Sequence, residues 1–93
     1  MNIIYSHNIN KAVEKLEEIR KQKRLIEIKR NHNNGEITYV FEDEVWKWVR
    51  PSYKVRGNRV VKCLVDASSV TLKEYWEIIL PSCIYGESDV DYF

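Results

Sequence analysis

The segment that most constrains the fold is Val60–Val65, a near-continuous apolar run that ends in Asp66. Apolar residues at successive positions, rather than at alternate ones, are typical of a strand that is buried on both faces, as in a parallel sheet. Asn2–Tyr5, near the amino terminus, also has the pattern of a short strand. We therefore expect part of the sheet to be parallel.

A helix is predicted from about Ile9 to Gln22. Apolar residues recur there at the i, i+3, i+4, i+7 spacing that places them on one stripe, namely Ile9, Ala12, Val13, Leu16 and Ile19. Asn8 is the expected N-cap. The basic residues at positions 20–24 suit the negative end of the helix dipole.

A second helix is predicted to begin after Thr71, because Thr71 and Glu74 have the spacing of a capping box. It is expected to run to about Leu80, and Pro81 should end it. The expected buried stripe consists of Leu72, Tyr75, Trp76 and Ile79.

A β-hairpin is predicted from Leu25–Arg30 and Glu36–Phe41. Asn34-Gly35 between them is the strongest short hairpin signal in the chain, because a type I′ turn needs positive φ at both central residues. That turn would place Ile28 opposite Phe41 and His32 opposite Ile37. Val45–Arg50 and Tyr53–Arg56 are read as shorter extended pieces separated by Pro51.

These elements predict an α/β fold, with a small mixed β-sheet, one β-hairpin and two helices in a single domain. A chain of 93 residues has the size of one domain. We expect residues 1–85 to form it and residues 86–93 to be a frayed acidic tail.

Composition excludes several classes of protein. No apolar run approaches the ~20 residues that a membrane span needs, and the first residues lack the charged leader of a signal peptide, so a cytoplasmic location is expected. Cys63 and Cys83 lie among apolar residues, which indicates reduced and buried thiols. His7 and His32 show no metal-ligand spacing to them, so we expect no metal site.

Charge is unevenly spread along the chain. Residues 1–30 carry eight Lys or Arg against four Asp or Glu, whereas residues 63–93 carry one against six. Such asymmetry can steer association with a charged partner, or it can pair the two halves with each other.

Three segments together resemble one family: Ser52–Asn58, Cys63–Ser68 and Tyr75–Pro81 look like the region around the Walker B strand of phage large terminases. These are the ATPases that pump DNA into phage capsids. In that family an Arg-Gly turn precedes a hydrophobic strand that ends in Asp-Glu, and a helix with a proline beyond it follows. Asn2–Gln22 resembles the preceding strand and helix, so the resemblance spans roughly residues 2–82 and implies that Asp66 matches the Walker B aspartate.

The departures from the family argue against catalysis. None of the three glycines, Gly35, Gly57 and Gly86, precedes a Lys-Ser/Thr pair, so the phosphate-binding loop has no counterpart. Ala67 stands where the family has its catalytic glutamate. We therefore expect no triphosphate site, no cofactor and no enzymatic activity.

Residues 46–62 combine aromatic and basic side chains in a way that is unusual for this chain. The candidate binding residues, for a protein or for nucleic acid, are Trp46, Lys47, Trp48, Arg50, Tyr53, Lys54, Arg56 and Arg59. On an extended strand the two tryptophans project to one face and Lys47 to the other. The two tryptophans could stack on single-stranded nucleic acid, form a protein interface, or fill the core of a small domain.

The function predicted from these observations is that of a non-catalytic, phage-encoded interaction protein in the host cytoplasm. It would bind, and in one version inhibit, a host or phage protein machine. An anti-defence inhibitor and a regulator of a DNA-packaging motor both fit. The alternative from another class of function is a single-stranded nucleic-acid-binding module. A minimal ATPase is the third hypothesis.

The resemblance also predicts assembly. The family's Walker B strand pairs on one side with a strand that has no counterpart in this chain, which would leave Val60–Val65 as a hydrophobic edge. Either the Glu36–Phe41 hairpin covers that edge, or a second copy or a partner strand adds to it. We expect a homodimer or a sheet completed by a partner.

Overall fold

The computed structural model describes residues 2–31, 35–52, 60–83 and 88–93. The elements are, in chain order, β1 (Asn2–Tyr5), α1 (Ile9–Arg20), β2 (Leu25–Asn31), β3 (Glu36–Phe41), β4 (Val45–Val49), β5 (Lys62–Val65), α2 (Leu72–Glu74), the π-helical turn η2 (Tyr75–Ile79), α3 (Leu80–Ser82) and β6 (Asp89–Tyr92).

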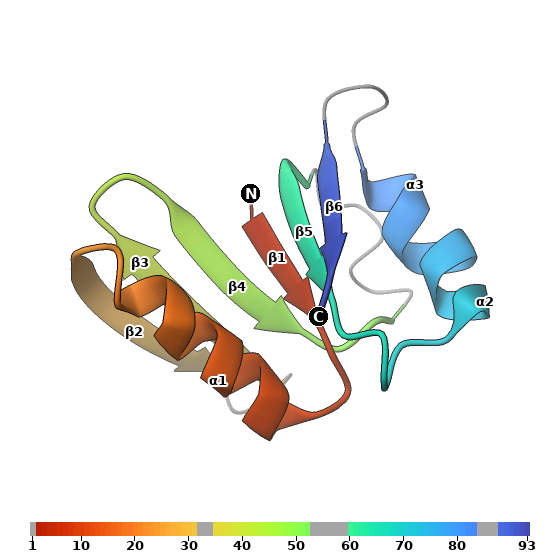
Figure 1. Cartoon of the computed structure of the whole chain (residues 1–93), viewed down its shortest axis with the longest axis horizontal. Coiled ribbons are helices and arrows are strands. Elements are labelled where there is room, and N and C mark those ends of the chain that lie inside the picture. The colour runs from red at the N-terminus through yellow and green to blue at the C-terminus, as the bar shows by residue number, and fades with distance from the viewer. Residues whose placement is uncertain (1, 32–34, 53–59, 84–87) are drawn as a thin grey trace.

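The strands form one six-stranded mixed sheet in the order β2-β3-β4-β1-β5-β6 (Figure 1). β2, β3 and β4 pair antiparallel, and β4, β1, β5 and β6 run parallel. Ile4 of β1 is in register with Trp48 of β4 and with Leu64 of β5. The α/β prediction of a small mixed sheet with a hairpin and two helical segments is confirmed.

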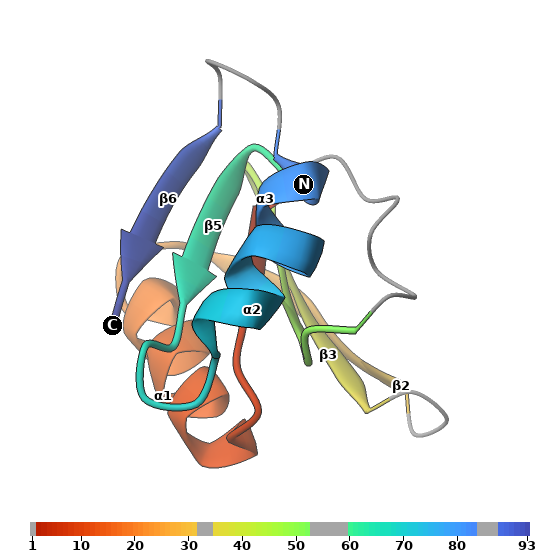
Figure 2. The same ribbon diagram turned by 90° about the vertical axis from the view of Figure 1, so that its right-hand side faces the viewer.

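The two helical segments cover opposite faces of the sheet (Figures 1 and 2). α1 packs against an apolar cluster formed by Ile4, Ala12, Leu16, Ile37, Tyr39, Phe41, Trp46 and Trp48. The α2–α3 segment packs on a second cluster, formed by Ile3, Tyr5, Val49, Val60, Cys63, Val65, Ile78 and Ile79. β1 contributes to both clusters and is buried on both faces, as strands in the middle of a parallel sheet are.

The first helix forms as predicted and is two residues shorter at its end. The Asn8 side chain accepts hydrogen bonds from the backbone N–H groups of Asn10 and Lys11, which confirms it as the N-cap. Ala12 and Leu16 are fully buried beneath the helix.

The second helix begins at the predicted capping box, because Thr71 and Glu74 bond each other's backbone N–H groups. The predicted stripe is confirmed at Tyr75 and Ile79, which pack on the second apolar cluster, but it is wrong at Leu72 and Trp76, and the predicted end is wrong. A π-helical turn changes the angular spacing of the residues, so Ile78 is buried, whereas Leu72 and Trp76 are 78% and 63% exposed. The helix also continues past Pro81 to Ser82.

The hairpin strands are confirmed, but the predicted register is wrong by two residues. Asn31 pairs with Glu36 across a four-residue connection, so Ile28 lies opposite Tyr39. Gly35 has the positive φ that the turn requires, 70°, and its N–H donates to the Asn31 carbonyl over 2.9 Å. His32 lies outside the described residues.

Residues 89–92 of the acidic tail form a strand, which corrects the expectation that this part of the tail is frayed. The backbone N–H of Asp89 donates to the Val61 carbonyl (2.8 Å), and that of Phe93 to the Val65 carbonyl (3.0 Å). Val90 packs on the second apolar cluster and Phe93 on the first, so these two residues anchor the segment on either side of the sheet.

This pairing removes the reason for expecting assembly at Val60–Val65. β5 lies between β1 and β6, and its backbone groups therefore have partners within the chain. Neither the Glu36–Phe41 hairpin nor a second copy is needed to cover it. The outer strands of the described sheet are β2 and β6.

Candidate functional site

A buried polar cluster lies where the parallel strands β1 and β5 end. Tyr5 and Val65 are in register, so the next residue of each strand, Ser6 and Asp66, emerges at the same edge of the sheet. Both side chains are fully buried. This edge is where ligands bind in open α/β sheets, which makes the cluster the first place to look for chemistry.

The Asp66 carboxylate is surrounded by donors from its own chain. Its Oδ1 accepts from Lys11 Nζ (2.8 Å), from the Ser68 hydroxyl (2.7 Å) and from the Ser68 backbone N–H (3.1 Å). Its Oδ2 accepts from the hydroxyls of Ser6 (2.8 Å) and Ser69 (2.9 Å). A carboxylate offers about four lone-pair positions, so five contacts occupy it fully.

These contacts decide the charge state of the cluster. Burial alone would raise the pKa of Asp66, but the hydrogen bonds from Lys11, Ser68, Ser6 and Ser69 outweigh it and hold the pKa well below its usual range. Lys11 Nζ donates both to this carboxylate and to the Ser68 hydroxyl, each over 2.8 Å, so it is engaged by groups of the chain itself. The cluster therefore has the chemistry of a structural hub.

Other ionisable groups near the cluster are also engaged. His7 Nε2 lies 2.6 Å from a carboxylate oxygen of Glu74, which is the capping-box residue of α2. Burial disfavours the ionised form of Glu74, but hydrogen bonds from the Thr71 backbone and from His7 lower its pKa. Within residues 2–31, 35–52, 60–83 and 88–93, no group of three or more His, Cys, Asp or Glu is placed to hold a metal ion.

The two tryptophans among the candidate binding residues fill the core, which was one of the three alternatives left open by the sequence, so neither forms an exposed stacking surface. Trp46 is 6% exposed and Trp48 is 1% exposed, and both pack beneath α1. The indole N–H of Trp48 donates to the Ser6 carbonyl (2.9 Å), and that of Trp46 donates to Glu44 (2.9 Å). A domain this small uses its large aromatic residues to fill its interior.

The remaining residues of the predicted binding segment are dispersed. Lys47 projects to the opposite face, as predicted, and pairs with Glu36 over 2.6 Å. Arg50 is exposed, with its guanidinium 5.2 Å from the centre of the Trp48 ring. The others, Tyr53, Lys54, Arg56 and Arg59, lie outside the described residues.

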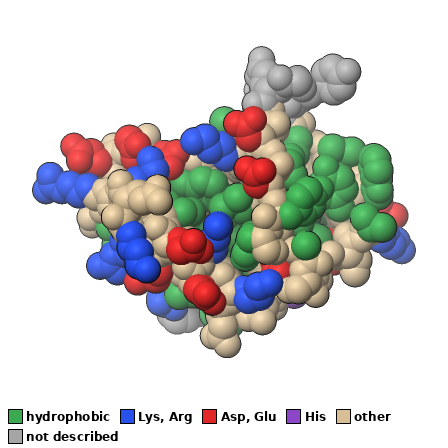
Figure 3. All heavy atoms as spheres, in the orientation of Figure 1, with side chains coloured by type: hydrophobic (Ala, Val, Ile, Leu, Met, Phe, Trp, Pro, Cys, Tyr) green, Lys and Arg blue, Asp and Glu red, His purple; other side chains and the backbone are tan. Residues whose placement is uncertain are grey.

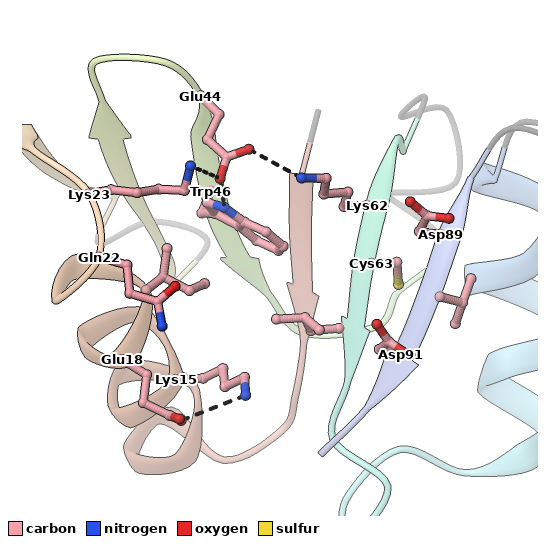
Figure 4. A pocket seen from close by; sticks show the side chains of 13 residues that line it. Lys15, Glu18, Gln22, Lys23, Glu44, Trp46, Lys62, Cys63, Asp89 and Asp91 are labelled. Carbon is pink, nitrogen blue, oxygen red and sulfur yellow. Dashed lines mark hydrogen bonds and ion pairs between the residues drawn. The ribbon is translucent and has the colours of Figure 1, made fainter.

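An open groove of about 530 Å³ lies between α1 and β6 (Figure 4). Most of its charged side chains already pair with each other. Lys15 lies 3.6 Å from Glu18, and Glu44 lies 3.0 Å from Lys23 and 3.7 Å from Lys62. A groove whose cations and anions neutralise each other has little means of selecting a charged ligand.

The most unusual surface is apolar and lies on the outer face of the second helix. Figure 3 shows hydrophobic side chains gathered over α2 and α3. Leu72, Trp76 and Leu80 are 78%, 63% and 39% exposed, and Tyr92 of the neighbouring strand β6 is 59% exposed. Sequence reasoning missed this surface. The signal is present in the regular four-residue spacing of Leu72, Trp76 and Leu80, but that spacing defines one side of a helix whether the side is buried or exposed.

The comparisons with known proteins show a fold and no sequence family. Two structures of the large terminase from a thermophilic bacteriophage resemble this chain with TM-scores of 0.62 (crystal form 2) and 0.63 (crystal form 3), at 9% and 10% identity. They cover 99% and 98% of this chain but only 26% and 24% of the terminase chain. A third structure of that terminase, in complex with ADP, has a TM-score of 0.60 at 10% identity.

No protein-family model matches the sequence, and no curated protein matches it either. The chain thus has a large-terminase-like fold and spans about a quarter of the length of that terminase. In the described parts of the chain, no helix is long and apolar enough to cross a membrane.

Proposed function

We propose that this chain is a non-catalytic protein-binding module built on the fold of the Walker B region of a large terminase. It would bind a protein partner during a phage infection through the outer face of its second helix. The observation that carries the proposal is the exposed row Leu72, Trp76 and Leu80, at 78%, 63% and 39% exposure. We call these three residues the apolar helix face.

The state of the polar cluster supports a non-catalytic role. If Asp66 corresponds to the Walker B aspartate, its carboxylate would have to face a magnesium ion bound to nucleotide. Here five contacts from the protein occupy it, and Ala67 follows in place of a glutamate. Opening this site would break the Lys11–Asp66 ion pair and expose a carboxylate that the fold buries completely.

The apolar helix face has the chemistry of a protein interface. Monomeric proteins rarely expose a contiguous patch of large apolar side chains without a use for it. Tryptophan is the residue most enriched among those that dominate binding energy, and Trp76 is held edge-on against Tyr75 with ring centres 5.8 Å apart. A pre-positioned tryptophan loses less conformational entropy on binding than a free one.

Two kinds of protein partner are compatible with a terminase-like module. A module that copies one part of a packaging enzyme can occupy a surface that this part normally contacts, which would make it a regulator of a packaging motor. A small phage protein with an apolar binding face can equally disable a host defence protein. Both belong to the same class of function, which is protein binding without catalysis.

The proposal is tested by affinity capture from lysate of infected host cells, performed with and without nuclease, using the wild type, Trp76→Ala and a control. Val45→Ala is the matched control, because Val45 is also apolar and 39% exposed but lies on β4, away from the helix face. We expect a protein that the wild type and the control retain and that Trp76→Ala loses. Partners that are unaffected by Trp76→Ala, or recovery of nucleic acid alone without nuclease, would contradict the proposal.

A further inference from the structure

Strand β2 forms one outer edge of the described sheet and carries an unusual set of exposed residues. All but the first of its seven residues are exposed, and they include two isoleucines, Ile26 at 63% and Ile28 at 37%. An outer strand presents a row of backbone N–H and C=O groups on which another strand can add. Exposed isoleucines on such a strand favour pairing, because they gain burial when a neighbour arrives.

The charges on β2 are arranged so that two antiparallel copies of the strand can place opposite charges against each other. Glu27 and Lys29 flank Ile28 on either side and project to the opposite face of the sheet. Both are more than half exposed, and their charged groups lie only 4.0 Å apart within the strand. An exposed pair of this kind contributes little to stability, so both groups are available to a partner.

We propose that two copies of this chain pair antiparallel through β2, with Ile28 on the twofold axis. Each Glu27 then lies opposite the partner's Lys29, and each Ile28 lies opposite the partner's Ile28. The arrangement is isologous, so it closes as a dimer. The two sheets become one continuous sheet, and the α1 face of both copies points the same way.

The neighbouring registers are disfavoured by charge. Sliding one strand by two residues in either direction places Glu27 opposite the partner's Glu27, or Lys29 opposite the partner's Lys29. Like charges directly opposite each other destabilise a strand pair. A slide by one residue would bring residues that project to opposite faces of the sheet into opposing positions of the strand pair. The register centred on Ile28 is the one that matches both charge and face.

The other outer strand does not offer the same fit. An antiparallel pair of β6 strands centred on Val90 would place Asp89 opposite the partner's Asp91 on both sides. A head-to-tail contact of β2 with β6 would leave one free edge at each end and would add copies without limit. The charge pattern therefore selects β2 with itself.

The test is a charge swap read by sedimentation equilibrium. A strand pair buries less than the ~1,200 Å² of a standard interface, so the measurement should span about 10 μM to about 1 mM. We expect the wild type to reach a dimer within that range. Glu27→Lys and Lys29→Glu should each raise the dissociation constant of the dimer by about tenfold, because both opposite-charge pairs across the interface become like-charge pairs.

The combined variant Glu27→Lys/Lys29→Glu restores both opposite-charge pairs, so it should dimerise like the wild type. An equimolar mixture of the two single variants should form a heterodimer for the same reason. Glu14→Lys is the matched control, because Glu14 is exposed on α1 and the substitution changes net charge by the same amount as Glu27→Lys.

Two results would overturn the inference. A strict monomer at about 1 mM, with single variants identical to the wild type, would show that the charges on β2 prevent pairing rather than direct it. A mass that grows beyond the dimer with concentration would show head-to-tail pairing of β2 with β6.

Discussion

The ammonium group of Lys11, in the first turn of α1, lies 2.8 Å from a carboxylate oxygen of Asp66, the residue that follows β5. The Lys11 side chain is 37% exposed, and Asp66 is fully buried. The pair thus ties α1 to the carboxyl edge of the sheet, with Ser6, Ser68 and Ser69 completing the shell around the carboxylate.

Replacing Asp66 by Asn should lower the free energy of unfolding by about 2–4 kcal/mol. The substitution keeps the shape but removes the charge that Lys11 and the three hydroxyls solvate. Urea denaturation at pH 7 measures the change. Asp91→Asn is the control, because Asp91 is exposed on β6 and should change stability by no more than about 0.5 kcal/mol. Equal values for the two variants would contradict the structural role of Asp66.

The same carboxylate predicts how stability depends on pH. Because the pKa of Asp66 is lowered in the folded state, the unfolded chain takes up the proton first as the pH falls below about 4. Its contribution is therefore complete near neutral pH and is lost in acid. Urea midpoints at pH 7, 5 and 3 should fall more steeply below pH 5 for the wild type than for Asp66→Asn. Parallel curves would mean that Asp66 does not contribute.

The Cys63 thiol should be unreactive in the folded chain. Burial, with a smaller effect from neighbouring Cys83, raises the pKa of the Cys63 thiol to about 12, and the side chain is 1% exposed. In a Cys83→Ser variant, Cys63 should resist a thiol reagent at pH 8 and react fully once the chain is unfolded in urea. Rapid labelling of the folded variant would show that β5 opens.

The tryptophans should separate into core and surface residues. Trp48→Ala removes a buried ring and leaves the Ser6 carbonyl without its indole donor, so we expect a loss of about 3–5 kcal/mol. Trp76→Ala removes an exposed ring and should cost less than about 1 kcal/mol. Thermal unfolding followed by circular dichroism measures both. A large loss in Trp76→Ala would mean that the apolar helix face supports the fold rather than a partner.

Local signals in the sequence predicted the elements well. The Asn8 cap, the Thr71–Glu74 capping box and the apolar stripe on α1 depend on residues a few positions apart, and each is present in the structure. The hairpin was also a local signal, although its register depended on a loop length that the Asn34-Gly35 pair alone did not determine.

Non-local packing accounts for the errors. The acidic residues 89–92 look solvated, and they become a strand because β5 offers an open edge and Val90 finds an apolar cluster. Only part of the polar cluster could be predicted from the sequence, because Lys11 and Asp66 are in contact although they lie 55 positions apart in the chain. That Trp48 is buried and Trp76 is exposed likewise depends on which face of the sheet each helix covers.

Whether Asp66 serves the fold or a nucleotide is tested most directly by thermal unfolding with and without millimolar Mg-ATP. A site saturated at about 100 times its dissociation constant would add about 2.7 kcal/mol to the free energy of unfolding. We predict no upward shift in the melting temperature and no release of phosphate. An upward shift that Lys11→Gln or Asp66→Asn abolishes would contradict a non-catalytic role for this chain.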